Sequence, residues 1–232
     1  MLNVLKLFAL ALTAVMLSCA DYKELNLEPI PSEPIKDSRD GNEYETVTIG
    51  KQVWMAKNLK YEGEEKNIGV CYGDKNTVKN PDNCENYGKL YTWAEAMGYP
   101  PSYNEQLSNN YGKRQGICPN GWHIPSKEEW DILVDYVGLN SEEKLKSKEM
   151  WYPGLNGLDE YGFKALPGGT YWTQGYKEVS KCAFWWSSTE LEATQTQSTW
   201  ICPDTRTDVP TDKIFGADKR ENSLLSVRCI KN

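Results

Sequence analysis

The sequence GICPNGWHIPSKEEW, residues 116–130, marks the point where a turn-rich segment gives way to a helix. Ser126 and Glu129 have the spacing of a capping box, in which each side chain accepts a hydrogen bond from the backbone N–H of the other residue. Apolar residues then recur at helical intervals, at Trp130, Leu133, Val134 and Val137. The pattern predicts an amphipathic helix from Ser126 to Gly138 that packs on the core through this stripe.

Weaker patterns on both sides of this helix predict further elements. Residues 50–51 lie between two apolar segments, which is typical of a hairpin. Residues 89–97 predict a short helix that ends at Gly98, and a charged helix is expected from Ser141 to about Lys148. Residues 61–86 are polar and rich in turns.

The later part of the chain is rich in glycine and β-forming residues. Strands are predicted at residues 163–166, 171–172, 182–187, 199–202 and 224–230. Helices early and strands late predict one α+β domain over residues 43–232, with two or three short helices and a mostly antiparallel, loop-rich sheet.

Residues 1–18 resemble a bacterial lipoprotein signal. Residues 7–17 are apolar apart from Thr13, which fits a secretory signal and is too short for a bilayer. Cys19 follows, and in lipoproteins the cysteine at this place becomes the lipidated N-terminus. We expect an exported protein that binds membrane lipid through acylated Cys19 at the outer membrane or cell surface. An ordinary signal peptide is the alternative.

Residues 19–42 have the composition of a flexible tether. Three prolines, all between residues 29 and 34, interrupt a charged stretch that has no apolar periodicity. The sequence therefore predicts a signal peptide at residues 1–18, a lipid-anchored tether at residues 19–42 and a folded domain at residues 43–232.

The composition excludes several classes of function. The formal net charge is −7, whereas nucleic-acid binding requires a basic surface. His123 is the single histidine, which excludes metal sites with two imidazoles. Its neighbours are core-forming, so we expect it to make one hydrogen bond in the core and not to act in catalysis.

Six ordered motifs occur along the domain. They are residues 53–59 (VWMAKNL), 91–97 (YTWAEAM), 116–130, 162–169 (GFKALPGG), 184–190 (FWWSSTE) and 226–229 (SVRC). Over roughly residues 44–231 the chain is similar to the Fibrobacter succinogenes major paralogous domain family. Members are typically secreted or surface lipoproteins without a firmly assigned activity. They are distantly similar to C-type-lectin-like domains and to formylglycine-generating enzymes, so the resemblance implies a C-type-lectin-like fold.

Besides Cys19, the chain has six cysteines: Cys71, Cys84, Cys118, Cys182, Cys202 and Cys229. An even number in an exported chain indicates disulfides, and six cysteines allow fifteen connectivities. Cys118 and Cys229 lie in the family's motifs and are expected to join the central helix to the last strand. Spacing favours the local pairs Cys71–Cys84 and Cys182–Cys202.

Catalytic and metal sites are not indicated. Formylglycine-type chemistry needs free cysteines, whereas Cys202 and Cys229 have disulfide partners in this scheme. The calcium-binding motifs of C-type lectins are absent. An acidic loop is expected to be solvated and not to bind calcium; it holds Asp204, Asp208, Asp212 and Asp218. We therefore expect no enzyme activity, no metal and no cofactor.

Aromatic side chains on the loop side of the domain are the candidate ligand-binding residues. They are Trp151, Tyr171, Trp172 and Trp186. Rings suit stacking on the C–H faces of sugars, and burial under long loops is the alternative. We expect a non-catalytic envelope lipoprotein that binds polysaccharide or mediates adhesion; an extracellular enzyme or a purely structural envelope protein are the alternatives.

The lipoprotein signal gives a direct prediction. Cys19→Ala should move the protein from membranes into the soluble fraction and leave the domain folded, because the acyl chains would be its attachment. Fractionation with salt and carbonate washes measures this. A variant that stays in the washed membranes would contradict lipid anchoring.

Overall fold

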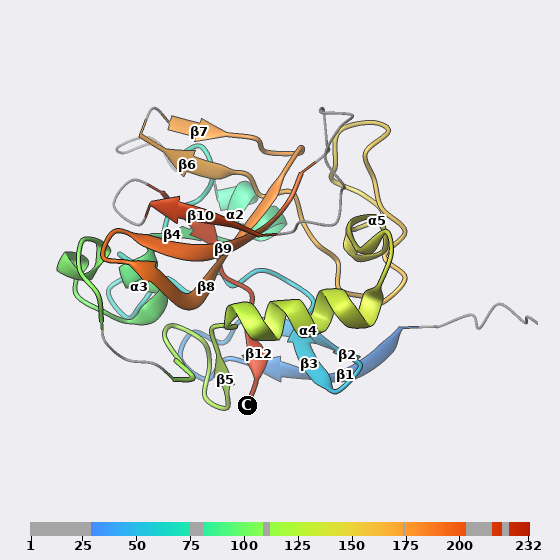
Figure 1. The fold of residues 1–232 in the computed structure, drawn as a ribbon, viewed down its shortest axis with the longest axis horizontal. Helices are drawn as coiled ribbons and strands as arrows, with labels where there is room; N and C mark the ends of the chain where they lie inside the picture. Colours follow the sequence, from blue (N-terminus) through green and yellow to red (C-terminus); the bar gives the residue numbers. More distant parts are fainter. Residues whose placement is uncertain (1–28, 75–80, 109–111, 174, 203–214, 220–222) are drawn as a thin grey trace, which may run out of the picture.

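The computed structural model describes residues 29–74, 81–108, 112–173, 175–202, 215–219 and 223–232. In these residues the chain forms two five-stranded sheets, a two-stranded hairpin and short helices, with helix α4 (Lys127–Val137) crossing the front of the view (Figure 1). This mixture of helices and mostly antiparallel strands confirms the predicted α+β class. No helix in the described residues is both long and apolar enough to cross a membrane.

The first sheet brings the two ends of the domain together. Its order is β1-β2-β3-β12-β5, with β1 at Ile30–Lys36, β2 at Glu43–Ile49, β3 at Gln52–Met55, β12 at Ile230–Lys231 and β5 at Trp122–His123. β2 and β3 form the hairpin predicted at residues 50–51, which is confirmed. Ile230 in the last strand pairs with both Trp54 and His123, so β12 closes the sheet between β3 and β5.

Strand β1 corrects the predicted tether. It pairs antiparallel with β2 at the edge of the first sheet. Pro31 and Pro34 are tolerated because an edge strand has one unpaired side. The strand is held by main-chain hydrogen bonds, and most of its side chains are exposed. It therefore needs no apolar pattern in its sequence. The tether predicted over residues 19–42 is therefore wrong from Ile30 onward, and the ordered domain begins before Glu43.

The second sheet contains most of the later strands. Its order is β10-β9-β8-β11-β4, with β10 at Phe215–Lys219, β9 at Gln195–Ile201, β8 at Ala183–Glu192, β11 at Leu225–Ser226 and β4 at Leu90–Tyr91. β11 and β8 run parallel, and the other neighbours are antiparallel. β6 (Thr170–Trp172) and β7 (Gly175–Lys177) form a separate hairpin. The predicted strands other than residues 163–166 overlap β6, β8, β9, β11 and β12.

Residues 163–166 are not a strand, so that prediction is wrong. Lys164 has a φ of 51°, and this left-handed conformation interrupts an extended segment. The carbonyl groups of Phe163 and Lys164 accept hydrogen bonds from Arg228. A buried cation thus takes the acceptors that a neighbouring strand would otherwise use.

Helix α4 confirms the helix predicted from its cap. Ser126 Oγ accepts a hydrogen bond from the Glu129 N–H, and the Glu129 carboxylate accepts one from the Ser126 N–H. The side chains of Trp130, Leu133 and Val137 are buried against the sheets.

The other helices differ from the predictions. The helix predicted at residues 89–97 begins only at α3 (Trp93–Met97), because β4 pairs with β11 and Thr92 caps the helix. α5 (Ser141–Leu145) is shorter than predicted, since Lys146 bridges to Ala165. Helix α2 (Pro81–Tyr87) was not predicted, and a 3-10 helix, η1, lies at Pro101–Asn104.

Four buried aromatic rings join the two sheets to helix α4. They are Trp54 in β3, Trp130 in α4, Phe163, and Trp185 in β8. The centroids of neighbouring rings lie 4.7 to 6.2 Å apart, in tilted and edge-on arrangements. Such arrangements favour aromatic contacts beyond the burial of apolar area alone.

A buried guanidinium lies against this aromatic cluster. Arg228 is fully buried, with its Cζ atom 4.6 Å from the centroid of Phe163. Its Nε and Nη2 atoms donate to Asn58 Oδ1 at 3.0 and 2.8 Å. The remaining donors reach three main-chain carbonyls, those of Met55, Phe163 and Lys164. Each N–H group of the cation therefore has an acceptor.

Asn58 extends this network to the second sheet and to helix α2. Its Oδ1 atom also accepts a hydrogen bond from Trp185 Nε1 at 2.8 Å, and its Nδ2 atom donates to the Tyr87 carbonyl. Burial lowers the pKa of Arg228 to about 9, and the nearby Asp159 carboxylate opposes the shift. The guanidinium is therefore charged at neutral pH.

The six cysteines other than Cys19 form three disulfides. These are Cys71–Cys84, Cys118–Cys229 and Cys182–Cys202. They are the pairs that spacing and the family motifs favoured. The second links the segment before α4 to the segment between β11 and β12, across 111 positions of sequence, so it restricts the unfolded chain most in the loop-entropy account.

Asn58→Ala should lower the free energy of unfolding by about 3–5 kcal/mol, because it leaves a buried charge without two of its hydrogen bonds and Trp185 Nε1 without an acceptor. Asn86→Ala is the control, since Asn86 is exposed and its removal should change stability by less than about 0.5 kcal/mol. Urea denaturation measures both. Equal stability of the two variants would contradict the role given to Asn58.

Candidate functional site

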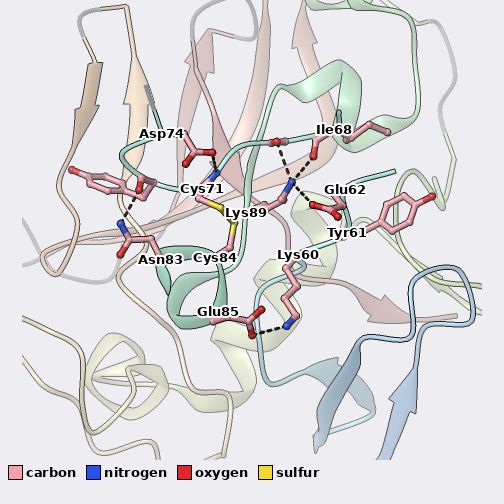
Figure 2. The surroundings of a disulfide bond; sticks show 12 residues. Lys60, Tyr61, Glu62, Ile68, Cys71, Asp74, Asn83, Cys84, Glu85 and Lys89 are labelled. Atoms are coloured by element: carbon pink, nitrogen blue, oxygen red, sulfur yellow. Dashed lines mark hydrogen bonds and ion pairs between the residues drawn. A yellow bond between two sulfur atoms is a disulfide. The ribbon is translucent and has the colours of Figure 1, made fainter. Parts of the chain in front are cut away.

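The disulfide Cys71–Cys84 joins helix α2 to the loop that precedes it, with ion pairs close by (Figure 2). A cavity of about 420 Å³ lies between α2 and the loop at residues 147–166. A second cavity of about 440 Å³ lies between α2 and residues 60–74. The two cavities share three lining residues, Lys60, Cys84 and Glu85. They therefore adjoin, and we call them together the α2 groove.

Ion pairs fix the walls of the α2 groove. Lys60 Nζ lies 2.7 Å from the Glu85 carboxylate, where the two cavities meet. Lys89 Nζ lies 3.3 Å from the Glu62 carboxylate and donates to the carbonyl of Ile68. Figure 2 shows both pairs beside the disulfide. Lys89 is buried and holds the loop in place, whereas the Lys60–Glu85 pair is open to a ligand.

Strained backbone gathers at the Asp159 end of this groove. Met150, Asp159 and Lys164 all line the first cavity, and their φ angles are 75°, 47° and 51°. Non-glycine residues adopt such angles rarely, and these conformations concentrate at functional sites. The structure thus holds three strained residues around one cavity.

The Asp159 carboxylate is itself perturbed. Burial raises the pKa of Asp159, although the hydrogen bond from the Lys164 N–H and nearby positive charges act in the opposite direction. That hydrogen bond is 2.8 Å long. A partly buried carboxylate with a raised pKa at the wall of a cavity is a candidate for ligand contact.

Three tyrosine rings form a second feature, which we call the tyrosine cluster. The ring centroid of Tyr176 lies 5.1 Å from those of both Tyr72 and Tyr171, and all three side chains are partly exposed. Burial raises the pKa of Tyr176 to about 12, so the phenol is neutral at physiological pH. Asn83 of α2 donates to the Tyr72 carbonyl at 2.8 Å, which links the cluster to the helix.

The predicted ligand-binding rings are only partly supported. Trp151 and Trp186 are buried, so their assignment as ligand-contacting rings is wrong. Trp151 Nε1 donates to the Ala165 carbonyl and Trp186 Nε1 to the Tyr91 carbonyl, which satisfies both indoles inside the fold.

The other two predicted rings reach the surface. Tyr171 belongs to the tyrosine cluster. Trp172 is partly exposed, with its ring edge-on to buried Phe184 at 5.6 Å. Of the four candidates, Tyr171 is therefore the one that the structure places among other accessible rings.

His123 is a buried structural residue. Its Nε2 atom lies 2.9 Å from the Glu129 carboxylate, and its Nδ1 atom lies 2.8 Å from Asn232 Oδ1. The histidine thus has two partners where the sequence predicts one. Burial raises the pKa of Glu129, but hydrogen bonds from His123 and Ser126 outweigh it and leave the pKa lowered. Because His123 contacts both Asn232 and Glu129, it connects the last residue of the sequence to helix α4.

Within the part of the chain that the structure describes, no group of three or more histidine, cysteine or acidic side chains has a geometry that could hold a metal ion. The acidic loop with Asp204, Asp208 and Asp212 lies outside the described residues, and the side chain of Asp218 is also not described.

Four of the six sequence motifs meet at the buried guanidinium, through Asn58, Phe163, Trp185 and Arg228. A family model matches the chain over residues 47–231. The chain belongs to the Fibrobacter succinogenes major domain family. No curated protein and no solved structure matches it. The motifs shared with the family thus account for the core of the domain, while the α2 groove and the tyrosine cluster lie largely outside them.

Several residues of the candidate site escape sequence reasoning. Asp159 and Lys164 carry no pattern that reveals their left-handed backbone. Tyr72 reaches Tyr176 from a loop about a hundred positions earlier in the sequence, so no local pattern reveals that contact. The pairing of Tyr171 opposite Tyr176 was the available signal, since two rings flank a short turn there.

Asp159→Asn should raise the melting temperature at pH 7, because it removes a charge that burial disfavours. The folded-state pKa is raised, so the stability from protonated Asp159 is complete below the unfolded value of about 3.9 and is lost as pH rises through the folded value. The advantage of the variant should therefore shrink toward about pH 3.

Melting curves at several pH values measure this effect. Asp135→Asn is the control, because Asp135 is an exposed residue of α4 and the change should have little effect at any pH. A gain for Asp159→Asn that is equal at all pH values would reflect only the tolerance of asparagine for positive φ and would contradict a raised pKa.

Proposed function

We propose that this protein is a non-catalytic lipoprotein of the cell envelope that binds polysaccharide. In this proposal it is exported, anchored through acylated Cys19 at the outer membrane or cell surface, and folded as a C-type-lectin-like domain. The α+β architecture and the paired cysteines support an exported binding module.

The tyrosine cluster is the observation that carries the polysaccharide proposal. A sugar ring offers C–H faces beside hydroxyl groups, so it is bound by an aromatic ring with polar groups close by. Tyr72, Tyr171 and Tyr176 offer partly exposed rings, and neutral phenols donate and accept hydrogen bonds. Tyr176 is central because it contacts both of the other rings.

The α2 groove supports an extended ligand over a single small one. It consists of two adjoining cavities whose walls hold carboxylates, ammonium groups and amides. Neutral hydroxyl groups can pair with each of these. Helix α2 contributes to both features, since Asn83 donates to the Tyr72 carbonyl while Cys84 and Glu85 line both cavities of the groove. A chain of sugars could follow this surface.

The arrangement of the domain suits display from a membrane. The β6–β7 hairpin lies at the opposite end of the view from β1, where the N-terminal segment joins the domain (Figure 1). A ligand on the tyrosine cluster would therefore be held away from the point of attachment.

The alternative of a formylglycine-type enzyme requires free thiols. All six cysteines that this chemistry could use lie in disulfides, which favours the binding module. A thiol count on the mature, unreduced protein separates the two: no free thiol supports the binding module, and two or more would support the enzyme.

Tyr176→Ala should weaken retention on polysaccharide about 5-fold or more, because loss of a stacking ring removes roughly 1 kcal/mol or more. Tyr136→Ala is the control, since Tyr136 is an exposed tyrosine on α4. Affinity electrophoresis through gels containing a panel of polysaccharides measures both variants. Equal retention of the two variants on each bound polysaccharide would contradict the assignment of the tyrosine cluster.

A further inference from the structure

Helix α4 exposes a stripe of large apolar side chains on the side away from the core. Ile132, Tyr136 and Leu139 are 53%, 54% and 79% exposed. Ile132 and Tyr136 are four residues apart and share one face of α4, and Leu139 follows the C-cap residue Gly138. An exposed apolar stripe opposite the buried one is unusual for a soluble surface and marks an interaction site.

This stripe lies where the N-terminal segment joins the domain. Pro29 lies against Gly162, and an added Cβ atom at Gly162 would be 3.0 Å from the Pro29 side chain. The neighbouring Tyr161 is in ring contact with Tyr136 at 6.1 Å. The start of the described domain at Pro29 is therefore connected to Tyr136 through contacts of Gly162 and Tyr161.

The β2–β3 turn makes the same connection from the other side. An added Cβ atom at Gly50 would be 2.8 Å from the Tyr136 ring, so the turn packs directly on the stripe. We call Ile132, Tyr136 and Leu139 the α4 face. Ile30 is also exposed but is not part of it. It pairs with Thr48, whereas Val47 and Ile49 on the other side of β2 are the residues that pack with α4.

The length of the preceding chain limits what can cover the α4 face. Between Cys19 and Pro29 a fully extended chain spans at most about 35 Å. If Cys19 carries lipid, the α4 face stays within that distance of the headgroups. Tyrosine and aliphatic side chains are the residue types that partition into this interfacial layer.

A second copy of the chain fits the α4 face less well. In a symmetric pair, the exposed acidic side chains of one α4, Glu128 and Asp135, would approach those of the other. A zwitterionic lipid surface imposes no such repulsion.

We propose that the α4 face rests on the lipid headgroup layer and orients the domain on the membrane. The inference rests on the proposed lipid anchor at Cys19. The β6–β7 hairpin lies apart from α4, at the top of the view (Figure 1), so this contact would leave the hairpin uncovered.

Photocrosslinking from vesicles tests the orientation. The chain from Cys19 to Asn232, made without acylation, is coupled through Cys19 to a maleimide lipid in phosphatidylcholine vesicles, so the anchor does not depend on processing in the cell. One protein carries Leu139→benzoylphenylalanine and its control carries Leu191→benzoylphenylalanine. Leu191 is also exposed, at 46%. It lies near the end of β8, two residues after Thr189, which accepts a hydrogen bond from the first residue of α4, whereas Leu139 follows the last residue of α4.

Irradiation should give lipid adducts from position 139 in several-fold excess over position 191. Equal lipid yields at the two positions, or no adduct at position 139, would overturn the proposal. A protein–protein adduct at position 139 would assign the face to a second copy instead. The lipid anchor itself is tested separately. If the wild-type protein is released from cell membranes by washing, Cys19 is not acylated in the cell, but the result from the chemically coupled vesicles still stands.

Discussion

The domain depends on one buried positive charge. Arg228 has no carboxylate within ion-pair distance among the described residues, and it is held by Asn58 and three main-chain carbonyls. Removing a guanidinium from water is costly unless each donor finds an acceptor. The segments at residues 55–58 and 163–164 must therefore present their oxygens to one point, and this requirement fixes loops that would otherwise have no regular structure.

This constraint explains why the family motifs say so little about function. Asn58, Phe163, Trp185 and Arg228 lie in four separate motifs and meet at the guanidinium. Their polar groups are paired with one another and with main-chain groups inside the fold. The surface features that could bind ligands lie largely in the segments between the motifs. A family defined by such motifs can keep one fold while its members bind different ligands.

The sequence predicted those elements that carry a local signal. Helix α4 has its capping box and apolar stripe, and the hairpin at residues 50–51 has its flanking strands, so both were predictable. The strand at residues 30–36 and the loop at residues 163–166 were mispredicted, because an edge pairing and a distant cation determine them. The same limit applied to the site: Trp186 looked accessible in a strand pattern, yet helix α3 and strand β4 cover it.

Attachment and binding place opposite demands on one small domain. If Cys19 carries lipid, as we propose, only about ten residues separate the anchor from Pro29, and a freely rotating module would often turn its ligand site toward the lipid. Helix α4 crosses the front of the domain, whereas the β6–β7 hairpin lies at the top of the view, so the two are separate surfaces (Figure 1). An apolar face next to the entry of the chain would remove that rotation without a long linker, since burial of a few side chains is enough to bias orientation once the anchor supplies the affinity. On this account the exposed residues of α4 orient the domain on the membrane, and the buried residues of the same helix stabilise the fold.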